Sequence, residues 1–141
     1  MIRVFLVFIL LVFSINCSLK AQTAYFESDS KFLINVSKAL QKNDTTKALK
    51  KLNKYIDKNP AVAELYLFRA RLKTERGDLD PAMIDLNTYC SIAPACPEAT
   101  YWKGKIKYMQ GDYGAAAEHF KTYQNGPHLE DAMIYTGLCY T

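Results

Sequence analysis

The sequence predicts an all-α fold in which helix–turn–helix units stack as a solenoid, and two observations carry this prediction. Apolar residues recur at helical spacing along most of the chain, and the residue columns of one unit return 34 positions later. The aspartates Asp44, Asp78 and Asp112 are 34 apart. The same interval separates three further sets: Ala48, Ala82 and Ala116; Leu52, Leu86 and Phe120; and Tyr55, Tyr89 and Tyr123. A chain of 141 residues, half of them apolar, suits one folded domain.

The unit at residues 59–94 shows why these residues form two helices. Residues 63–76 carry apolar side chains at helical spacing, and Gly77 ends this helix because glycine takes the left-handed backbone conformation cheaply. We expect Asp78 to cap the second helix, with its carboxylate accepting amide protons of the first turn. Pro81 fits that first turn, where its missing N–H costs nothing.

The neighbouring units repeat this design. Asn43 takes the turn of the preceding unit, since asparagine tolerates the left-handed conformation, and Gly111 takes the turn of the following one. Gly104 follows Ala70 at the same interval and places a second small side chain in mid-helix. We expect the paired helix to approach closely at both positions.

This period and these columns resemble the tetratricopeptide repeat (TPR), a helix–turn–helix unit whose period is about 34 residues. The matching residues are Ala70, Gly77, Asp78, Ala82, Leu86 and Pro94, then Gly104, Gly111, Asp112, Tyr113, Ala116 and Phe120. The resemblance implies a right-handed α-solenoid of about three TPR helix–turn–helix repeats plus a C-terminal helix. Arg69 stands where the family usually has leucine, Thr100 where a large aromatic residue is usual, and His128 replaces the closing proline.

The expected domain order follows from these boundaries. Residues 1–21 form a signal peptide, residues 22–28 a polar leader and residues 29–141 the TPR domain. The repeats are expected at about residues 29–60, 61–94 and 95–128, with a partial unit at residues 129–141.

The N-terminal segment predicts export. Arg3 is followed by ten apolar residues at 4–13, a run that fits the core of a signal peptide and is too short to span a bilayer. A cut after Ala21 would leave Gln22 first, and such cuts resemble signal peptides of the Bacteroidetes type. We therefore expect an exported protein, periplasmic or associated with the outer membrane of a Gram-negative envelope. Two alternatives stay open: a lipoprotein acylated at Cys17, and an uncleaved anchor.

The last segment, residues 129–141, is expected to form a helix that is apolar nearly all round. A repeat array needs a terminal helix with a polar outer face, so one apolar face should stay bare unless something covers it. Three interpretations stay open. The side chains fold flat on the third repeat, or the chain is truncated relative to a longer relative, or the face contacts a partner or a second copy through Ile134 and Leu138.

Two cysteines bracket the turn between the second and third repeats. Cys90 and Cys96 are six residues apart, and an oxidising compartment would favour a disulfide between them. For so short a loop the chain-entropy model gives about 2 kcal/mol of stabilisation. The alternative is that Cys90 is a small buried residue and Cys96 a free thiol in the loop. Cys139 has no partner close in sequence.

No pattern of catalytic or metal-ligating residues is recognisable. His119 and His128 stand in no metal-spaced motif, and the sequence has neither a nucleophile elbow nor a phosphate-binding loop. The carboxylates are expected mainly at helix caps and on helix surfaces. We therefore expect a protein that is not an enzyme and that uses no cofactor or metal ion. A lysine-rich helix face is interpreted as solvated rather than as a nucleic-acid contact; it comprises Lys47, Lys50, Lys51, Lys54 and Lys58.

In TPR proteins the first helices of successive repeats line a concave groove that holds a peptide or a partner helix, and the resemblance implies such a groove here. By that analogy its residues are Leu33, Ser37 and Leu40, then Leu67, Arg71 and Thr74, then Tyr101, Lys105 and Tyr108. Arg71 and Lys105 are one repeat period apart and should stack one above the other. Two cations flanked by tyrosines would suit an acidic or aromatic segment. The family's carboxylate clamp uses lysines and asparagines where this chain has Leu33, Ser37 and Leu67, so recognition of a chaperone's C-terminal carboxylate is not expected.

The sequence thus predicts a non-catalytic protein–protein interaction scaffold of the cell envelope, which binds a partner peptide or helix in the concave TPR groove. The residues expected to contact the partner are Leu67, Arg71, Tyr101, Lys105 and Tyr108. The alternative is a structural subunit of an envelope or outer-membrane assembly that associates through the apolar C-terminal helix. We expect no nucleic-acid partner, and a membrane contact only if Cys17 is lipidated.

Overall fold

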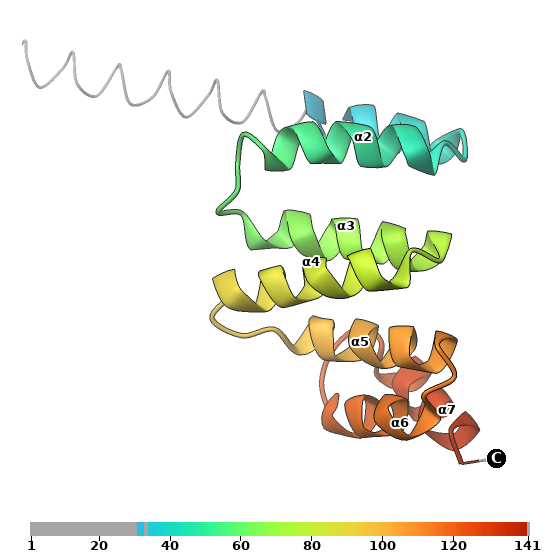
Figure 1. Ribbon diagram of the computed structural model, residues 1–141. Helices are drawn as coiled ribbons and strands as arrows, with labels where there is room; N and C mark the ends of the chain where they lie inside the picture. Colours follow the sequence, from blue (N-terminus) through green and yellow to red (C-terminus); the bar gives the residue numbers. More distant parts are fainter. Residues whose placement is uncertain (1–30, 33, 141) are drawn as a thin grey trace, which may run out of the picture. The chain divides into compact units, whose positions relative to one another are not determined.

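The computed structural model describes residues 31–32 and 34–140 (Figure 1). The expected signal peptide at residues 1–21, the polar leader and the candidate lipidation site Cys17 lie outside the described residues. Leu33, which the groove analogy includes, lies outside them as well. These expectations therefore remain predictions from the sequence.

Most of the described residues are helical, and no strand occurs among them, which confirms the expected all-α class. Residues 31–32 and 34–41 are helical. The helices that follow are α2 (Thr45–Ile56), α3 (Ala63–Arg76), α4 (Leu79–Ile92), α5 (Pro97–Met109), α6 (Tyr113–Thr122) and α7 (Leu129–Leu138). Short turns connect them, as the composition of the intervening residues predicts. In the described part of the chain no helix is long and apolar enough to cross a membrane.

The described residues belong to two compact units, one that ends at Lys51 and one that begins at Leu52. In the first unit, the helical residues 34–41 end at Asn43, whose φ of 54° confirms the expected left-handed turn. The Asp44 carboxylate then accepts a hydrogen bond of 2.9 Å from the backbone N–H of Lys47 and so caps the following helix.

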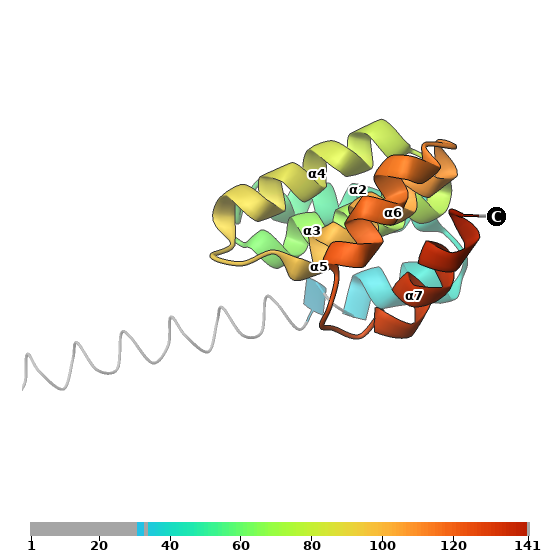
Figure 2. The same cartoon turned by 90° about the horizontal axis from the view of Figure 1, so that it is seen from below.

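The second unit consists of paired helices. Helix α3 packs against α4, α5 packs against α6, and α4 and α5 connect the two pairs (Figures 1 and 2). Helix α7 packs against α6. One contiguous apolar core runs through this unit; its members with under 3% exposure are Ala70, Ala82, Leu86, Ala99, Tyr101, Ile106, Ala116, Phe120 and Ala132. Each pair thus buries an apolar stripe that a single helix would leave in water.

The turns between paired helices repeat in geometry as well as in sequence. Gly77 and Gly111 have φ values of 91° and 79°, the left-handed conformation expected for both. In each turn the next residue donates a backbone hydrogen bond across the helix end. Asp78 N–H binds the carbonyl of Lys73 at 2.9 Å, and Asp112 N–H binds that of Lys107 at 3.0 Å. The recurring turn explains why the repeat period is visible in the sequence.

The predicted capping hydrogen bond of the Asp78 side chain is wrong. Asp78 is the N-cap residue of α4, but its side chain makes no capping hydrogen bond. The carboxylate instead forms an ion pair with Arg76, which lies two residues earlier. A charged guanidinium is a stronger donor than a backbone amide, so the Asp78 carboxylate pairs with Arg76 rather than with the amides of α4. Asp112 does cap α6, because its Oδ1 accepts from the N–H of Ala115 at 3.2 Å.

Small residues mark the close approach of paired helices, as expected. Ala70 in α3 is fully buried. A Cβ added to Gly104 in α5 would lie 2.9 Å from the Phe120 ring of α6 and 3.1 Å from the Cβ of His119. Gly137 occupies nearly the same register position in α7, and a Cβ there would meet no atom within 4 Å. The space beside Gly137 is therefore open, whereas the space beside Gly104 is filled by α6.

Candidate functional site

The most unusual polar feature of the second unit is a pair of cations on one aromatic ring. The guanidinium carbon of Arg71 lies 5.3 Å from the centroid of the Trp102 ring, and the Lys105 ammonium lies 5.0 Å from it. Trp102 is 3% exposed. We call these three residues the cationic platform. Arg71 comes from α3 and the other two from α5, so the platform joins two successive repeats.

The platform keeps its positive charge. Among the described residues, neither Arg71 nor Lys105 makes an ion pair or a side-chain hydrogen bond. A cation–π contact attracts a cation without neutralising it. The Trp102 indole N–H is buried and has no acceptor among these residues either. The platform therefore offers two charges and leaves one donor unsatisfied.

The residues predicted to contact a partner divide into two groups. Arg71, Lys105 and Tyr108 are partly exposed, and Tyr108 packs its ring against Tyr135 at 5.0 Å between centroids. Leu67 and Tyr101 are only 8% and 2% exposed, because the helix pairs bury them in the core. The first group is therefore accessible at the surface, whereas the second group belongs to the apolar core.

The burial of Tyr101 has a specific cause in helix α7. The Tyr101 ring stacks on the imidazole of His128 at 4.3 Å, and its hydroxyl donates to the Asp131 carboxylate at 3.4 Å. Burial, followed by the charge of Asp131, raises the pKa of Tyr101 to about 12. Through these two contacts Tyr101 connects the start of α7 to α5. The predicted groove residue Thr74 is also buried, and its hydroxyl donates to the Ala70 carbonyl at 2.9 Å.

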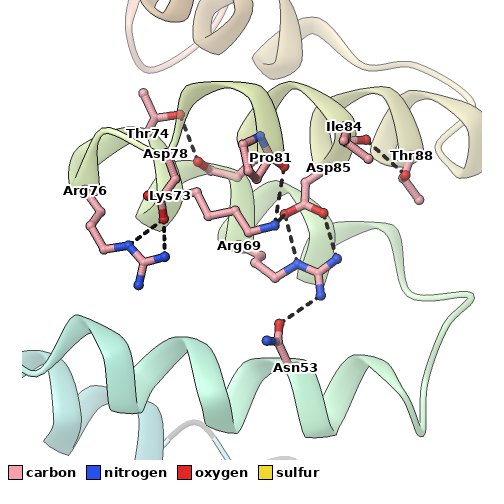
Figure 3. Close-up of polar contacts among 11 residues, drawn as sticks. Asn53, Arg69, Lys73, Thr74, Arg76, Asp78, Pro81, Ile84, Asp85 and Thr88 are labelled. Carbon is pink, nitrogen blue, oxygen red and sulfur yellow. Dashed lines mark hydrogen bonds and ion pairs between the residues drawn. The ribbon is translucent and has the colours of Figure 1, made fainter.

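A buried ion-pair network lies on another side of α3, and sequence reasoning missed it (Figure 3). Asp85 of α4 is 2% exposed. Arg69 binds both carboxylate oxygens, with Nη2–Oδ1 at 2.7 Å and Nε–Oδ2 at 2.9 Å, and the Lys73 ammonium lies 2.8 Å from Oδ2. Arg69 also donates to the amide oxygen of Asn53 at 2.9 Å. The expectation that carboxylates lie at caps and surfaces is wrong for Asp85.

This network explains why Arg69 replaces the usual leucine. A bidentate guanidinium contact satisfies the buried carboxylate and fixes its geometry. The guanidinium carbon of Arg69 also lies 5.5 Å from the centroid of the Tyr66 ring in the same helix. A signal was present in the sequence: one turn separates Arg69 from Lys73, and both lie in the helix that pairs with the helix of Asp85.

The structure joins Cys90 and Cys96 in a disulfide, with their Cα atoms 5.3 Å apart. It connects the end of α4 to the residue before α5, and so holds two successive repeats together. Cys139 is a free thiol, partly buried, and burial raises its pKa. The described residues contain no group of three or more histidine, cysteine or acidic side chains that could hold a metal ion.

Helix α7 exposes a large apolar surface. Met133 is 68% exposed and Ile134 62% exposed, and Leu138 of the same helix is 47% exposed. Beside them a groove of about 430 Å³ lies between α6 and α7. Its lining residues are Phe120, Lys121, Tyr123, Gln124, Leu129, Met133 and Thr136. Several large apolar side chains exposed on one helix are typical of a contact site.

Comparison with known proteins supports the repeat that the sequence predicts. The sequence model of the tetratricopeptide repeat family matches residues 84–130, which span α5 and α6 with part of each neighbouring helix. Comparison with curated proteins gave no match.

The solved structures similar to this chain include TPR domains. The TPR2B domain of yeast Sti1, solved in complex with pHsp70, superimposes with a TM-score of 0.68 at 18% sequence identity, over 79% of this chain and 94% of that one. The structure of MamA superimposes with a TM-score of 0.63 at 21% identity, over 74% of this chain and 62% of that one. The TPR domain of P58(IPK) gives a TM-score of 0.65 at 18% identity, over 86% of this chain and 34% of that one. The chain thus has the all-α TPR fold, as the repeat period predicts.

Proposed function

We propose that the protein is a non-catalytic scaffold of the cell envelope that binds an acidic segment of a protein partner at the cationic platform. The observation that carries this proposal is the pair of unneutralised cations, Arg71 and Lys105, on the Trp102 ring. Proteins with TPR folds bind other proteins, and the Sti1 domain was solved with pHsp70 bound. That relationship supports protein binding in general, and the chemistry of the platform supports the choice of an acidic partner.

The platform suits an acidic segment for three reasons. The two charges come from different repeats, so an extended or helical segment crossing both could place one carboxylate on each. The buried tryptophan fixes both cations, which lowers the side-chain entropy lost on binding. Tyr108 lies one turn after Lys105 on α5 and adds an amphipathic ring at the edge.

Fluorescence anisotropy with labelled peptides tests the proposal. A glutamate-rich peptide should bind, and a serine-rich peptide of equal length should not. Exchange of both cations, Arg71→Glu with Lys105→Glu, should remove the binding that the platform contributes and leave the oligomeric state of the protein unchanged. The matched control is Lys54→Glu with Lys58→Glu, which changes the net charge equally at two exposed lysines. An equal loss of peptide affinity in both double variants would show that binding depends only on the net charge of the protein. That result would refute the platform as the site.

The proposed place of action is the periplasm or the outer membrane. The apolar run at residues 4–13 supports export, and the bonded pair Cys90–Cys96 suits an oxidising compartment. Intact mass of the protein recovered from envelope fractions tests this. Loss of residues 1–21 with two hydrogens missing at the cysteines is the expected result. An added lipid mass on Cys17 would favour the lipoprotein, and a full-length reduced chain in the cytoplasm would contradict export.

A second candidate function is supported by helix α7. We propose that two copies associate through the face that contains Met133 and Ile134, which are more than 60% exposed. Residues 132–140 carry no charged side chain, so this part of the helix can meet a second copy without like-charge repulsion, and Gly137 between the large side chains permits close approach of the helices.

Analytical ultracentrifugation tests self-association. The protein should form dimers that dissociate on dilution, and Ile134→Glu should leave monomers. The matched control is Ile84→Glu in α4, because Ile84 is 66% exposed and lies on another helix. A protein that stays monomeric at high concentration would refute this candidate and leave the platform proposal unaffected.

A further inference from the structure

The buried network around Asp85 has a counterpart in the next repeat, in which the carboxylate is replaced. One repeat period after Arg69, Lys73 and Asp85, the corresponding positions are occupied by Lys103, Lys107 and His119. In the earlier repeat two cations of α3 converge on one carboxylate of α4. In the later repeat the corresponding positions hold two cations in α5 and a histidine in α6. The register of the repeat thus places two positive charges in α5 without a counterpart of Asp85, the anion that pairs with Arg69 and Lys73.

The geometry of α5 and α6 keeps these residues close together. Gly104 brings the helices so near that a Cβ on it would lie 3.1 Å from the Cβ of His119. Lys103 and Lys107 are four residues apart in α5 and therefore lie on the same helix face. Burial lowers the pKa of His119 first, and the charges of Lys103 and Lys107 lower it further. Both ammonium groups are therefore electrostatically coupled to the imidazole.

The positive charge of this cluster is only weakly balanced. The Lys107 ammonium lies 3.6 Å from the Asp112 carboxylate, a contact at the exposed end of the helix. Among the described residues Lys103 has no carboxylate within ion-pair distance. The Lys107 side chain is 34% exposed, so a group from outside can reach it. By contrast, the Asp85 side chain is only 3% exposed, so its network is not accessible to a group from outside.

We propose that Lys103, Lys107 and His119 form a binding site for the carboxylate of an aspartate or glutamate side chain on a protein partner. The partner's carboxylate supplies beside His119 the negative charge that Asp85 supplies in the preceding repeat. One carboxylate can bind both lysines, as the Asp85 carboxylate accepts hydrogen bonds from Arg69 and forms an ion pair with Lys73. The internal template is a carboxylate, which is why we choose this group rather than a phosphate.

This site is separate from the cationic platform. Lys105 lies two residues from both Lys103 and Lys107, and residues two apart on a helix point to different sides. An acidic partner can therefore occupy the cluster whether or not the platform binds anything. The failure of one site leaves the other intact, and the experiment is designed to show this.

Nuclear magnetic resonance of the imidazole groups tests the site in the full protein. The probe is a hexaglutamate peptide, added at constant ionic strength, with sodium chloride and inorganic phosphate as comparison anions. We expect a saturable shift of the His119 resonances and an upward shift of the His119 pKa, because a bound carboxylate favours the charged imidazole. The same result is expected in the platform variant Arg71→Ala with Lys105→Ala, which separates this site from the proposed function.

Variants complete the test with the labelled peptide in that platform background. His119→Asp restores the arrangement of the preceding repeat, so the variant should fold at least as stably and bind the peptide about tenfold more weakly. The matched control Asn125→Asp adds the same charge at an exposed loop position and should bind unchanged. Equal weakening in both variants, or no peptide-induced shift of His119, overturns the proposal. Equal shifts with chloride or phosphate overturn it too, since they would indicate an adventitious ion only.

Discussion

Arg71 and Lys105, which are one repeat period apart, lie against the same tryptophan ring. Their charged groups are 5.3 Å and 5.0 Å from the centroid of Trp102. The period that shapes the helices therefore also brings together two charges from successive repeats. The contact gives the second unit a positively charged surface patch whose position is fixed by a buried side chain.

The first prediction concerns the buried carboxylate. Asp85→Asn should lower the free energy of unfolding by about 3 kcal/mol, because it leaves the charges of Arg69 and Lys73 inside the helix pair without an anion. Urea denaturation measures the loss. Asp57→Asn is the control, since Asp57 is exposed and makes no ion pair among the described residues. Similar stability in both variants would show that the network contributes little.

The second prediction compares two glycines at nearly the same register position, Gly104 in α5 and Gly137 in α7. Gly104→Ala should lower the free energy of unfolding by about 1–3 kcal/mol, because the new methyl group would collide with the Phe120 ring. Gly137→Ala should instead raise it by about 0.5–1 kcal/mol, because alanine is the better helix former and the space there is open. Thermal denaturation of both variants measures these two changes in the free energy of unfolding. Destabilisation by Gly137→Ala would mean that another group already covers α7.

The third prediction concerns the disulfide. Reduction of the Cys90–Cys96 bond should lower the free energy of unfolding by about 2 kcal/mol, because the unfolded chain gains conformational freedom. Urea denaturation with and without a reductant measures this difference. The double variant Cys90→Ser with Cys96→Ser should match the reduced protein and show no response to the reductant. A response in that variant would point to Cys139 instead.

The fourth prediction is a dependence of stability on alkaline pH. The pKa of Tyr101 is raised from 10.0 to about 12 in the folded protein, chiefly by burial. Above pH 10 the unfolded chain therefore loses this proton more readily than the folded protein does. The contribution of Tyr101 to the free energy of unfolding should be fully present below pH 10. It should be lost progressively as the pH rises towards 12.

Tyr101→Phe provides the comparison for this effect. The variant keeps the ring but has no hydroxyl to ionise, so its free energy of unfolding should fall less steeply above pH 10. Guanidinium denaturation between pH 9 and pH 11.5 would measure both slopes, and other tyrosines contribute equally to each protein. Parallel slopes would show that Tyr101 titrates normally.

The helices and turns could be predicted from the sequence because they depend on local rules. Gly77 and Gly111 end helices through their own backbone conformation, and the expected helix at residues 63–76 coincides with α3. Side-chain partners were harder to predict. The Asp78 carboxylate had two competing donors, and no local rule ranks a neighbouring arginine against a backbone amide in advance.

The candidate site shows the same limit. The stacking of Arg71 and Lys105 followed from the period, but their common support on Trp102 depends on how α3 and α5 pack. Tyr101 was placed on the groove by analogy, whereas α7 covers it through His128 and Asp131. The Arg69–Asp85 pair joins two helices, so the one-turn spacing of Arg69 and Lys73 could indicate the two cations but not their anion.

The most direct test of the cationic platform is the fluorescence of Trp102, the only tryptophan in the chain. Its emission should change in a saturable manner when a glutamate-rich peptide is added, because the peptide alters the charges on its ring. The change should weaken as salt concentration rises and should be absent in the Arg71→Ala, Lys105→Ala variant. A saturable change of the same size and affinity in that variant, or no change in the unmodified protein, would contradict binding at the platform.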